Sequence, residues 1–118
     1  MPDYTIKSID DLYRRVPKKN PNCWKDINGK KVPSSFAFKT KPDEDGLSVN
    51  IAVLSSFQET VIFSDLFGVA KFPASIPIEE GYECRQDKKT DNPAHALIVG
   101  DTRPIAKKLA GASVEIFE

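Results

Sequence analysis

Proline positions constrain this chain more than any other feature, because they set the borders of most regular segments. Proline lacks a backbone N–H and fixes φ near about −65°, so it interrupts helices and is confined to the ends or edges of strands. Pro17 therefore ends the first regular segment, and Pro73 and Pro77 limit a central strand. Pro104 suits the first turn of a final helix. We expect short elements that pack around one core.

Length and composition predict a single globular domain over residues 1–118. The chain is 40% hydrophobic and 29% charged, which is typical of folded rather than disordered proteins. We find no apolar signal segment at the start and no apolar run long enough to span a bilayer. Two distant cysteines, Cys23 and Cys84, are expected to be reduced. These features predict a cytoplasmic protein without a membrane partner.

Capping residues and apolar spacing predict about three helices. Ser8 can cap the first, in which apolar residues recur at helical spacing. Ser56 opens a capping box for the second, and Asp101 or Thr102 can cap the third. The predicted helices cover residues 8–16, 56–66 and 102–112.

Alternating apolar residues predict a mostly antiparallel sheet of about five to six strands. Phe36 and Phe38 would lie on one face of a strand that forms a hairpin with residues 47–53, across an acidic turn. Further strands are expected at residues 67–72, 82–85, 94–99 and 114–117. Together with the helices, this order predicts an α+β fold in which helices back the sheet.

Residues 17–33 are predicted to form a long irregular segment with a tight turn at Asn28-Gly29. Three of the nine prolines lie here. Trp24 is expected to hold the segment against the core. Because long loops without regular structure are uncommon unless they serve a purpose, this segment is also a candidate recognition surface.

His95 is the one histidine and the candidate for acid–base catalysis. It stands at the start of a predicted strand, directly after a polar loop that ends at Pro93. Histidine titrates near neutral pH, and a rigid strand at the mouth of a loop could hold it for catalysis. The alternative is a structural histidine that is hydrogen-bonded near Asp91 or Asn92. The sequence identifies no catalytic partner, so both interpretations stay open.

Arg14, Arg15, Trp24 and Arg103 are the candidate binding residues. The first three belong to a basic stretch with aromatic residues, a mixture that holds single-stranded nucleic acid. Arg103 lies where a strand leads into a helix, and helix N-termini attract phosphate. The alternatives are a solvated helix end and loop for the first group, and a helix that Asp101 caps for Arg103.

Metal and thiol chemistry find little support in the sequence. One histidine and two distant cysteines offer no paired metal ligands, and the acidic turn at residues 43–46 lacks the spacing of a calcium loop. We therefore expect neither a metal nor a cofactor. Cys84 could be a nucleophile if Arg85 or His95 stabilised its thiolate, but a cysteine in a strand more often serves packing.

Five short blocks together resemble small uncharacterised bacterial proteins, a domain of unknown function. They are residues 12–16, 34–38, 46–49, 67–70 and 92–98. The resemblance covers most of the chain and implies a bacterial origin and a self-contained domain. It implies no activity and no catalytic residues. It would place Tyr13-Arg14 at the start of a strand rather than inside a helix.

Three functions remain open from the sequence. The formal net charge is zero, which argues against an extended nucleic-acid surface and favours a protein partner or self-association. The first hypothesis is therefore a non-catalytic protein-binding or accessory domain. The second is a small enzyme that acts on a nucleotide or nucleic acid, with His95 as general acid or base and Arg14, Arg15 or Arg103 on phosphate. The third is a nucleic-acid-binding domain that uses the basic N-terminal third.

One structural observation separates these hypotheses. A crevice in which His95 meets an arginine together with a hydroxyl or carboxylate would favour the enzyme over the binding domain.

Overall fold

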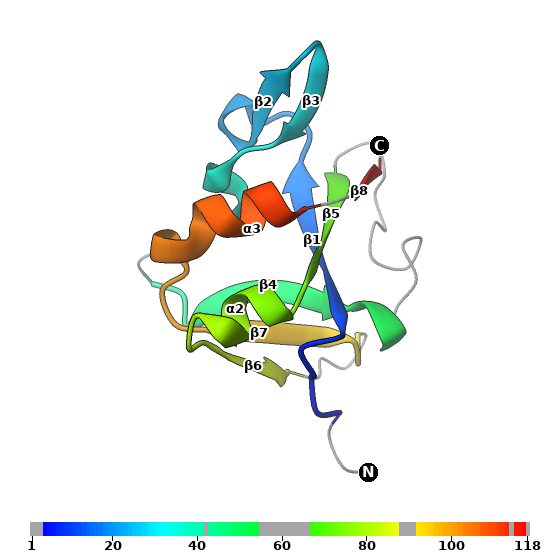
Figure 1. Cartoon of the computed structure of the whole chain (residues 1–118), viewed down its shortest axis with the longest axis vertical. Helices are drawn as coiled ribbons and strands as arrows, with labels where there is room; N and C mark the ends of the chain where they lie inside the picture. Colours follow the sequence, from blue (N-terminus) through cyan, green and yellow to red (C-terminus); the bar gives the residue numbers. More distant parts are fainter. Residues whose placement is uncertain (1–3, 42, 55–66, 88–91, 114, 118) are drawn as a thin grey trace.

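The computed structural model describes residues 4–41, 43–54, 67–87, 92–113 and 115–117, and Figure 1 shows their arrangement. Six strands form the main sheet: β1 (Asp11–Pro17), β4 (Gly46–Ile51), β5 (Phe67–Pro73), β6 (Glu83–Gln86), β7 (His95–Val99) and β8 (Glu115–Phe117). A separate hairpin consists of β2 (Trp24–Ile27) and β3 (Lys30–Pro33). The α-helices are α2 (Ser75–Glu79) and α3 (Ala106–Ala112), and short 3-10 helices lie at Pro21–Cys23, Ser35–Phe38, Ala52–Leu54 and Arg103–Ile105.

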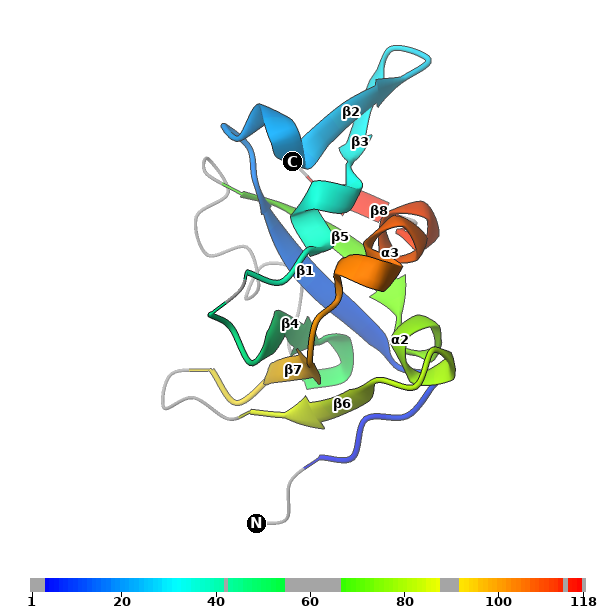
Figure 2. The ribbon, with the colours of Figure 1, turned by 90° about the vertical axis from the view of Figure 1, so that its left-hand side faces the viewer.

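The main sheet is antiparallel throughout its described pairs, in the order β6-β7-β4-β1-β5-β8. Figure 2 shows α2 and α3 on one side of these strands and the β2–β3 hairpin projecting at one end of the molecule. The α+β fold with a mostly antiparallel sheet is therefore as predicted. No helix within the described ranges is long and apolar enough to cross a membrane.

The core lies between the sheet and the helices, because alternate residues of each strand point to the helical side. Leu12, Ile51 and Ile98 are fully buried on that face. Phe38 and Phe72 pack edge to face there, with ring centroids 5.8 Å apart, an arrangement that aromatic pairs prefer. This packing leaves the opposite face of the sheet to carry polar side chains.

The helix predicted over residues 8–16 is wrong, because most of this segment forms β1. Leu12 and Val16 stand four residues apart, a spacing that fits one face of a helix and one face of a strand equally well. Both are fully buried in the strand, while Ile9, which would share their face in a helix, is 86% exposed. Tyr13-Arg14 accordingly lie within a strand.

The long irregular segment predicted over residues 17–33 is also wrong, although its turn is confirmed. Asn28 and Gly29 both have positive φ, 53° and 80°, which is the backbone of the tight turn that joins two antiparallel strands. The sequence does not indicate the flanking strands, because most of their side chains are exposed and show no apolar alternation. A charged hairpin thus replaces the expected loop.

Two further predictions need correction. Ser35–Phe38, expected as a strand, is a 3-10 helix that buries Ala37 and Phe38 and turns Phe36 outward. The number of helices is also lower than expected, since the described part of the chain contains two α-helices rather than three. The helix predicted at residues 56–66 lies outside the described residues, and α2, which follows β5 and contains Pro77, was not predicted. The remaining strands and the final helix are confirmed within a few residues.

A buried pair of threonines ties the segment after Phe38 to the start of the last helical segment. Thr102 is fully buried, and its Oγ1 donates to the carbonyl oxygen of Phe38 at 2.5 Å. The same oxygen accepts a hydrogen bond from the backbone N–H of Thr40 at 3.1 Å, and the Thr102 N–H donates to Thr40 Oγ1 at 2.7 Å. One hydroxyl therefore satisfies two backbone groups that water does not reach.

We expect Thr102→Val to lower the free energy of unfolding by about 1–3 kcal/mol, because it leaves those two backbone groups without a partner. Urea unfolding followed by circular dichroism measures the change. Thr5→Val, at an exposed position, is the matched control and should stay within about 0.5 kcal/mol of the wild type. Equal stability of the two variants would contradict the role given to this pair.

Candidate functional site

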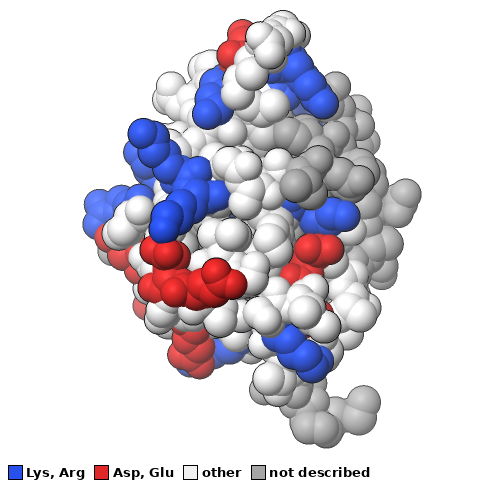
Figure 3. All heavy atoms as spheres, in the orientation of Figure 1, with Lys and Arg blue, Asp and Glu red and all other residues white. Residues whose placement is uncertain are grey.

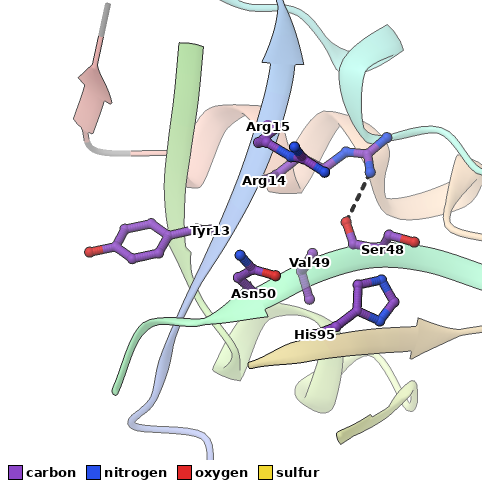
Figure 4. A pocket seen from close by; sticks show the side chains of 7 residues that line it. All are labelled: Tyr13, Arg14, Arg15, Ser48, Val49, Asn50 and His95. Atoms are coloured by element: carbon purple, nitrogen blue, oxygen red, sulfur yellow. Dashed lines mark hydrogen bonds between the residues drawn. The ribbon is translucent and has the colours of Figure 1, made fainter. Parts of the chain in front are cut away.

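The site begins where two neighbouring strands separate. β1 and β4 pair at Leu12↔Ile51 and Tyr13↔Asn50, whereas β1 and β5 stay paired along the whole of β1. Beyond Tyr13, the side chain of Arg14 bridges the separation. Its Nε donates to the carbonyl oxygen of Ala37 at 3.1 Å and its Nη1 donates to that of Ser48 at 2.9 Å, the bond drawn in Figure 4. A guanidinium thus takes the place of backbone ladder hydrogen bonds.

Arg14 lies between Leu12 and Val16 on the side of β1 that faces the core, and this burial affects the pKa of its guanidinium. Burial lowers the pKa of Arg14 from its usual value, and the charge of Glu44 acts in the opposite direction. Arginine nevertheless keeps its proton throughout the physiological pH range. A buried charge is costly unless it is hydrogen-bonded, and the two carbonyl oxygens meet this need while leaving further N–H groups of the guanidinium for a ligand.

A row of polar residues crosses the opposite face of the sheet. Strand register places Lys71 beside Tyr13, Tyr13 beside Asn50, and Asn50 beside His95. Asp87 continues the row past the end of β6, because its N–H donates to the His95 carbonyl oxygen at 2.7 Å. Antiparallel pairing alone therefore brings side chains from five different segments into one line.

Asp87 sets the tautomer and the orientation of the His95 ring. The Nδ1 of His95 lies 3.0 Å from the backbone carbonyl oxygen of Asp87 and 3.2 Å from its carboxylate Oδ2. A carbonyl oxygen can only accept, so Nδ1 carries the hydrogen and Nε2 of the neutral ring is a proton acceptor. The His95 side chain is 18% exposed, which keeps the ring rigid but leaves it in reach of a ligand.

Asn92 holds the loop in front of this pair. Its Nδ2 donates to Asn50 Oδ1 at 2.9 Å, and its carbonyl oxygen accepts a hydrogen bond from the His95 N–H at 3.2 Å. The strand that carries His95 is therefore fixed at its first residue. The backbone partners that a structural histidine would use are present too: the Asp87 carbonyl oxygen contacts the ring and the Asn92 carbonyl oxygen accepts from the His95 N–H, while Asp91 lies outside the described residues.

A cavity of about 160 Å³, called the His95 cavity below, lies over this arrangement. Figure 4 shows Arg14 and Arg15 extending from β1, with the His95 ring below Ser48. Small-molecule pockets typically measure about 300–1,000 Å³, so this one suits a group such as a phosphate rather than a whole ligand. The lining residues are Tyr13, Arg14, Arg15, Ser48, Val49, Asn50 and His95.

Three of the five predicted site residues thus meet in one cavity, namely His95, Arg14 and Arg15. Arg103 lies elsewhere and binds Asp101, with Nε 2.9 Å from Oδ1 and Nη2 2.8 Å from Oδ2. Hydrogen bonds from Arg103 lower the pKa of Asp101 to about 2. Asp101 also accepts from the Arg103 N–H at 3.0 Å, so it caps the helical turn, as the structural alternative anticipated.

Trp24 is separated from the His95 cavity and lies at the base of the projecting hairpin. Its Nε1 donates to the carbonyl oxygen of Pro17 at 2.8 Å, which fixes the ring. Together with four lysines of the same region it lines a hollow of about 400 Å³, called the hairpin hollow below. Those lysines are Lys18, Lys19, Lys25 and Lys31. Figure 3 shows basic side chains on the projecting hairpin.

Sequence reasoning missed Asp87, Asn50 and Ser48 as parts of the site. Ser48 lies in a predicted strand and Asp87 in the polar loop that ends at Pro93, and neither stands in a pattern that indicates chemistry. The strands predicted at residues 82–85 and 94–99 follow one another in the chain, so their pairing as a hairpin could be predicted. Its register, which alone places Asp87 beside His95, depends on the length of the loop between them and is not written in any local pattern.

Cys84 is not activated as a nucleophile. Burial, with a smaller contribution from the charge of Glu83, raises its pKa to about 11, so the thiol stays protonated at neutral pH. Burial likewise raises the pKa of Cys23. Within the described ranges, no cluster of three or more His, Cys, Asp or Glu side chains could hold a metal ion.

In comparisons with known proteins, no family model matches the chain, and no curated protein or solved structure matches it either. The resemblance to short bacterial proteins stays a prediction.

We expect Arg14→Lys to lower the free energy of unfolding by about 1–3 kcal/mol, because one ammonium group cannot reproduce two diverging hydrogen bonds from a planar fork. Chemical unfolding of the purified variant measures this. Arg85→Lys is the matched control, since Arg85 is exposed on β6. A loss no larger than that of the control would show that Arg14 does not hold the two strands.

Proposed function

We propose that this domain acts on a phosphate ester of a nucleotide or nucleic acid, with His95 as general acid and base. The observation that carries the proposal is the His95–Asp87 pair opening onto a cavity that two arginines also line. This is the crevice that would favour an enzyme over a purely binding domain. A guanidinium recognises phosphate oxygens, and an oriented imidazole moves the proton of the attacking or leaving oxygen.

RNA fits this site best among phosphate esters, because its 2′-hydroxyl supplies the nucleophile. His95 Nε2 would accept the proton of the 2′-hydroxyl while the 2′-oxygen forms the new bond to phosphorus. The bond from phosphorus to the 5′-oxygen then breaks, and the imidazolium returns its proton to that oxygen. Asp87 stabilises the imidazolium between these steps, as a carboxylate on Nδ1 does in general.

Arg15 is the expected contact for the phosphate oxygens, because it is exposed and lines the cavity. Arg14 adds a fixed positive charge beneath the same position. A charge that is already in place when the transition state forms costs no reorganisation at that moment.

The hairpin hollow also supports a polynucleotide substrate. It joins Trp24 with four lysines and one acidic residue, Asp26, and single strands bind to such combinations of stacking rings and positive charge. Lys18 and Lys19 directly follow β1, the strand that carries Arg14 and Arg15 into the His95 cavity. A strand bound along this route would pass from the hairpin to the imidazole.

A protein-binding function remains the second candidate. Of the large apolar side chains that are exposed among the described residues, three lie near one another in the sheet order: Ile9 is 86% accessible, Val53 64% and Leu54 40%. Ile9 precedes β1 and the other two follow β4, beyond the Leu12↔Ile51 pair that joins these neighbouring strands. Exposed apolar groups at one end of a sheet favour contact with another protein or with a second copy of the chain.

Cleavage of a fluorescently labelled RNA oligonucleotide tests the proposed activity. The wild type should cleave RNA and leave DNA of the same sequence intact, and His95→Gln should reduce the rate about 100-fold or more. Asp87→Asn should reduce kcat and change the pH dependence of the rate, because the Asp87 carboxylate orients the imidazole without touching the substrate. Lys107→Gln, on the exposed side of α3, is the control and should cleave at the wild-type rate.

Folding of each variant is checked by circular dichroism before the assay. A wild type that cleaves neither RNA nor any nucleotide ester, or a folded His95→Gln variant with the wild-type rate, would contradict the proposal. In that case, light scattering over a range of protein concentrations becomes the test of the second candidate.

A further inference from the structure

A second cavity lies on another side of Arg14. It has a volume of about 380 Å³, which falls within the range of about 300–1,000 Å³ that small-molecule sites occupy. The 3-10 helix Ser35–Phe38 and the residues after it form one wall, and Arg103 lies on the rim. Arg14 lines this cavity as well as the His95 cavity, so the two cavities share this side chain.

The inner surface of the second cavity is apolar and includes one aromatic ring. Cys23 and Ala37 are buried, and both line it. Phe36 is 47% exposed, because the 3-10 helix turns the next two residues, Ala37 and Phe38, into the core and leaves this ring outward. An exposed aromatic ring beside a cavity is a platform on which a planar heterocycle can stack.

The rim of the same cavity is positively charged. Lys39, Lys41 and Arg103 lie around it together with Arg14, and none of the described residues that line it is acidic. Two carboxylates lie just outside: Asp101 pairs with Arg103, and Glu44 accepts a hydrogen bond from the Lys41 N–H at 2.8 Å. Counting both, the region still has an excess of two positive charges, which matches the charge of one phosphate group.

We propose that the second cavity binds a nucleoside phosphate, with the base against Phe36 and the phosphate among Lys39, Lys41 and Arg103. An apolar floor alone would favour a neutral ring, and a cationic rim alone would favour a small anion. Their combination at one opening selects a molecule that carries both a flat ring and a phosphate. This site does not depend on the proposed activity, because His95 does not line it.

Isothermal titration calorimetry at low ionic strength tests this site with three probes: adenosine monophosphate, adenosine and inorganic phosphate. Adenosine monophosphate should bind at least about tenfold more tightly than either of its parts. Phe36→Ala should weaken its binding about tenfold, and Lys41→Ala should weaken it and reduce its salt dependence. Phe36 is half-exposed, so its truncation should leave the fold intact, which thermal unfolding verifies.

Two control variants make the outcome specific. Val53→Ala removes a different exposed apolar side chain, and Lys107→Ala a different exposed lysine, and both should bind adenosine monophosphate like the wild type. His95→Gln should also bind it like the wild type, whether or not RNA is cleaved. Absence of binding at millimolar concentration, equal binding of phosphate alone or of adenosine alone, or unchanged binding by Phe36→Ala would each overturn the proposal.

Discussion

The hydrogen bonds from Arg14 to the carbonyl oxygens of Ala37 and Ser48 are the interaction on which the site depends. β1 and β4 are neighbours in the sheet but separate after two residue pairs, Leu12↔Ile51 and Tyr13↔Asn50. Without a bridging donor, the carbonyl of Ser48 would lie at a gap in the ladder. Hydrogen bonds from a charged donor contribute about 1.5–3 kcal/mol each, enough to keep such a gap open in a small domain.

The gap explains why a cavity exists in the middle of a sheet, where side chains normally close over the surface. It allows a guanidinium that comes from the core side to reach a cavity whose other polar groups lie on the opposite face. His95 and Asp87 owe their meeting to the register of β6 and β7, and Asn50 owes its place to the register of β4 and β7. Strand pairing therefore places the polar side chains, and the hydrogen bonds of Arg14 keep the cavity between the strands open.

Much of the fold could be predicted from residues with a single structural meaning. The Asn28-Gly29 turn, the buried strand at residues 94–99 and the final helix all follow from strong local preferences. The spacing of Leu12 and Val16 fits both a helix and a strand. In the strand, Arg14 lies on the same core-facing side as these two residues, but the sequence suggests otherwise because a charged side chain is expected on the surface. Phe36 and Phe38 predict a strand because they alternate, but alternate aromatic residues also occur in a tight helical turn, which is what they form here.

The candidate site was predictable in part for the same physical reason. His95 could be chosen because it is the one histidine of the chain and histidine is the most frequent general acid or base. The two arginines could be chosen because they are adjacent in the sequence. Their proximity in space could not be foreseen while residues 8–16 were expected to be a helix. Asp87 depends on a register that spans a loop, and no local pattern contains it.

The central claim is that the cavity held open by Arg14 binds a phosphate group beside His95. Because the chain has a single histidine, the imidazole signals in a proton NMR spectrum belong to His95 without ambiguity. Titration with inorganic phosphate at constant pH and ionic strength should shift those signals with a saturable dependence, and Arg15→Gln should weaken it. Signals that stay in place up to high millimolar phosphate would contradict the account.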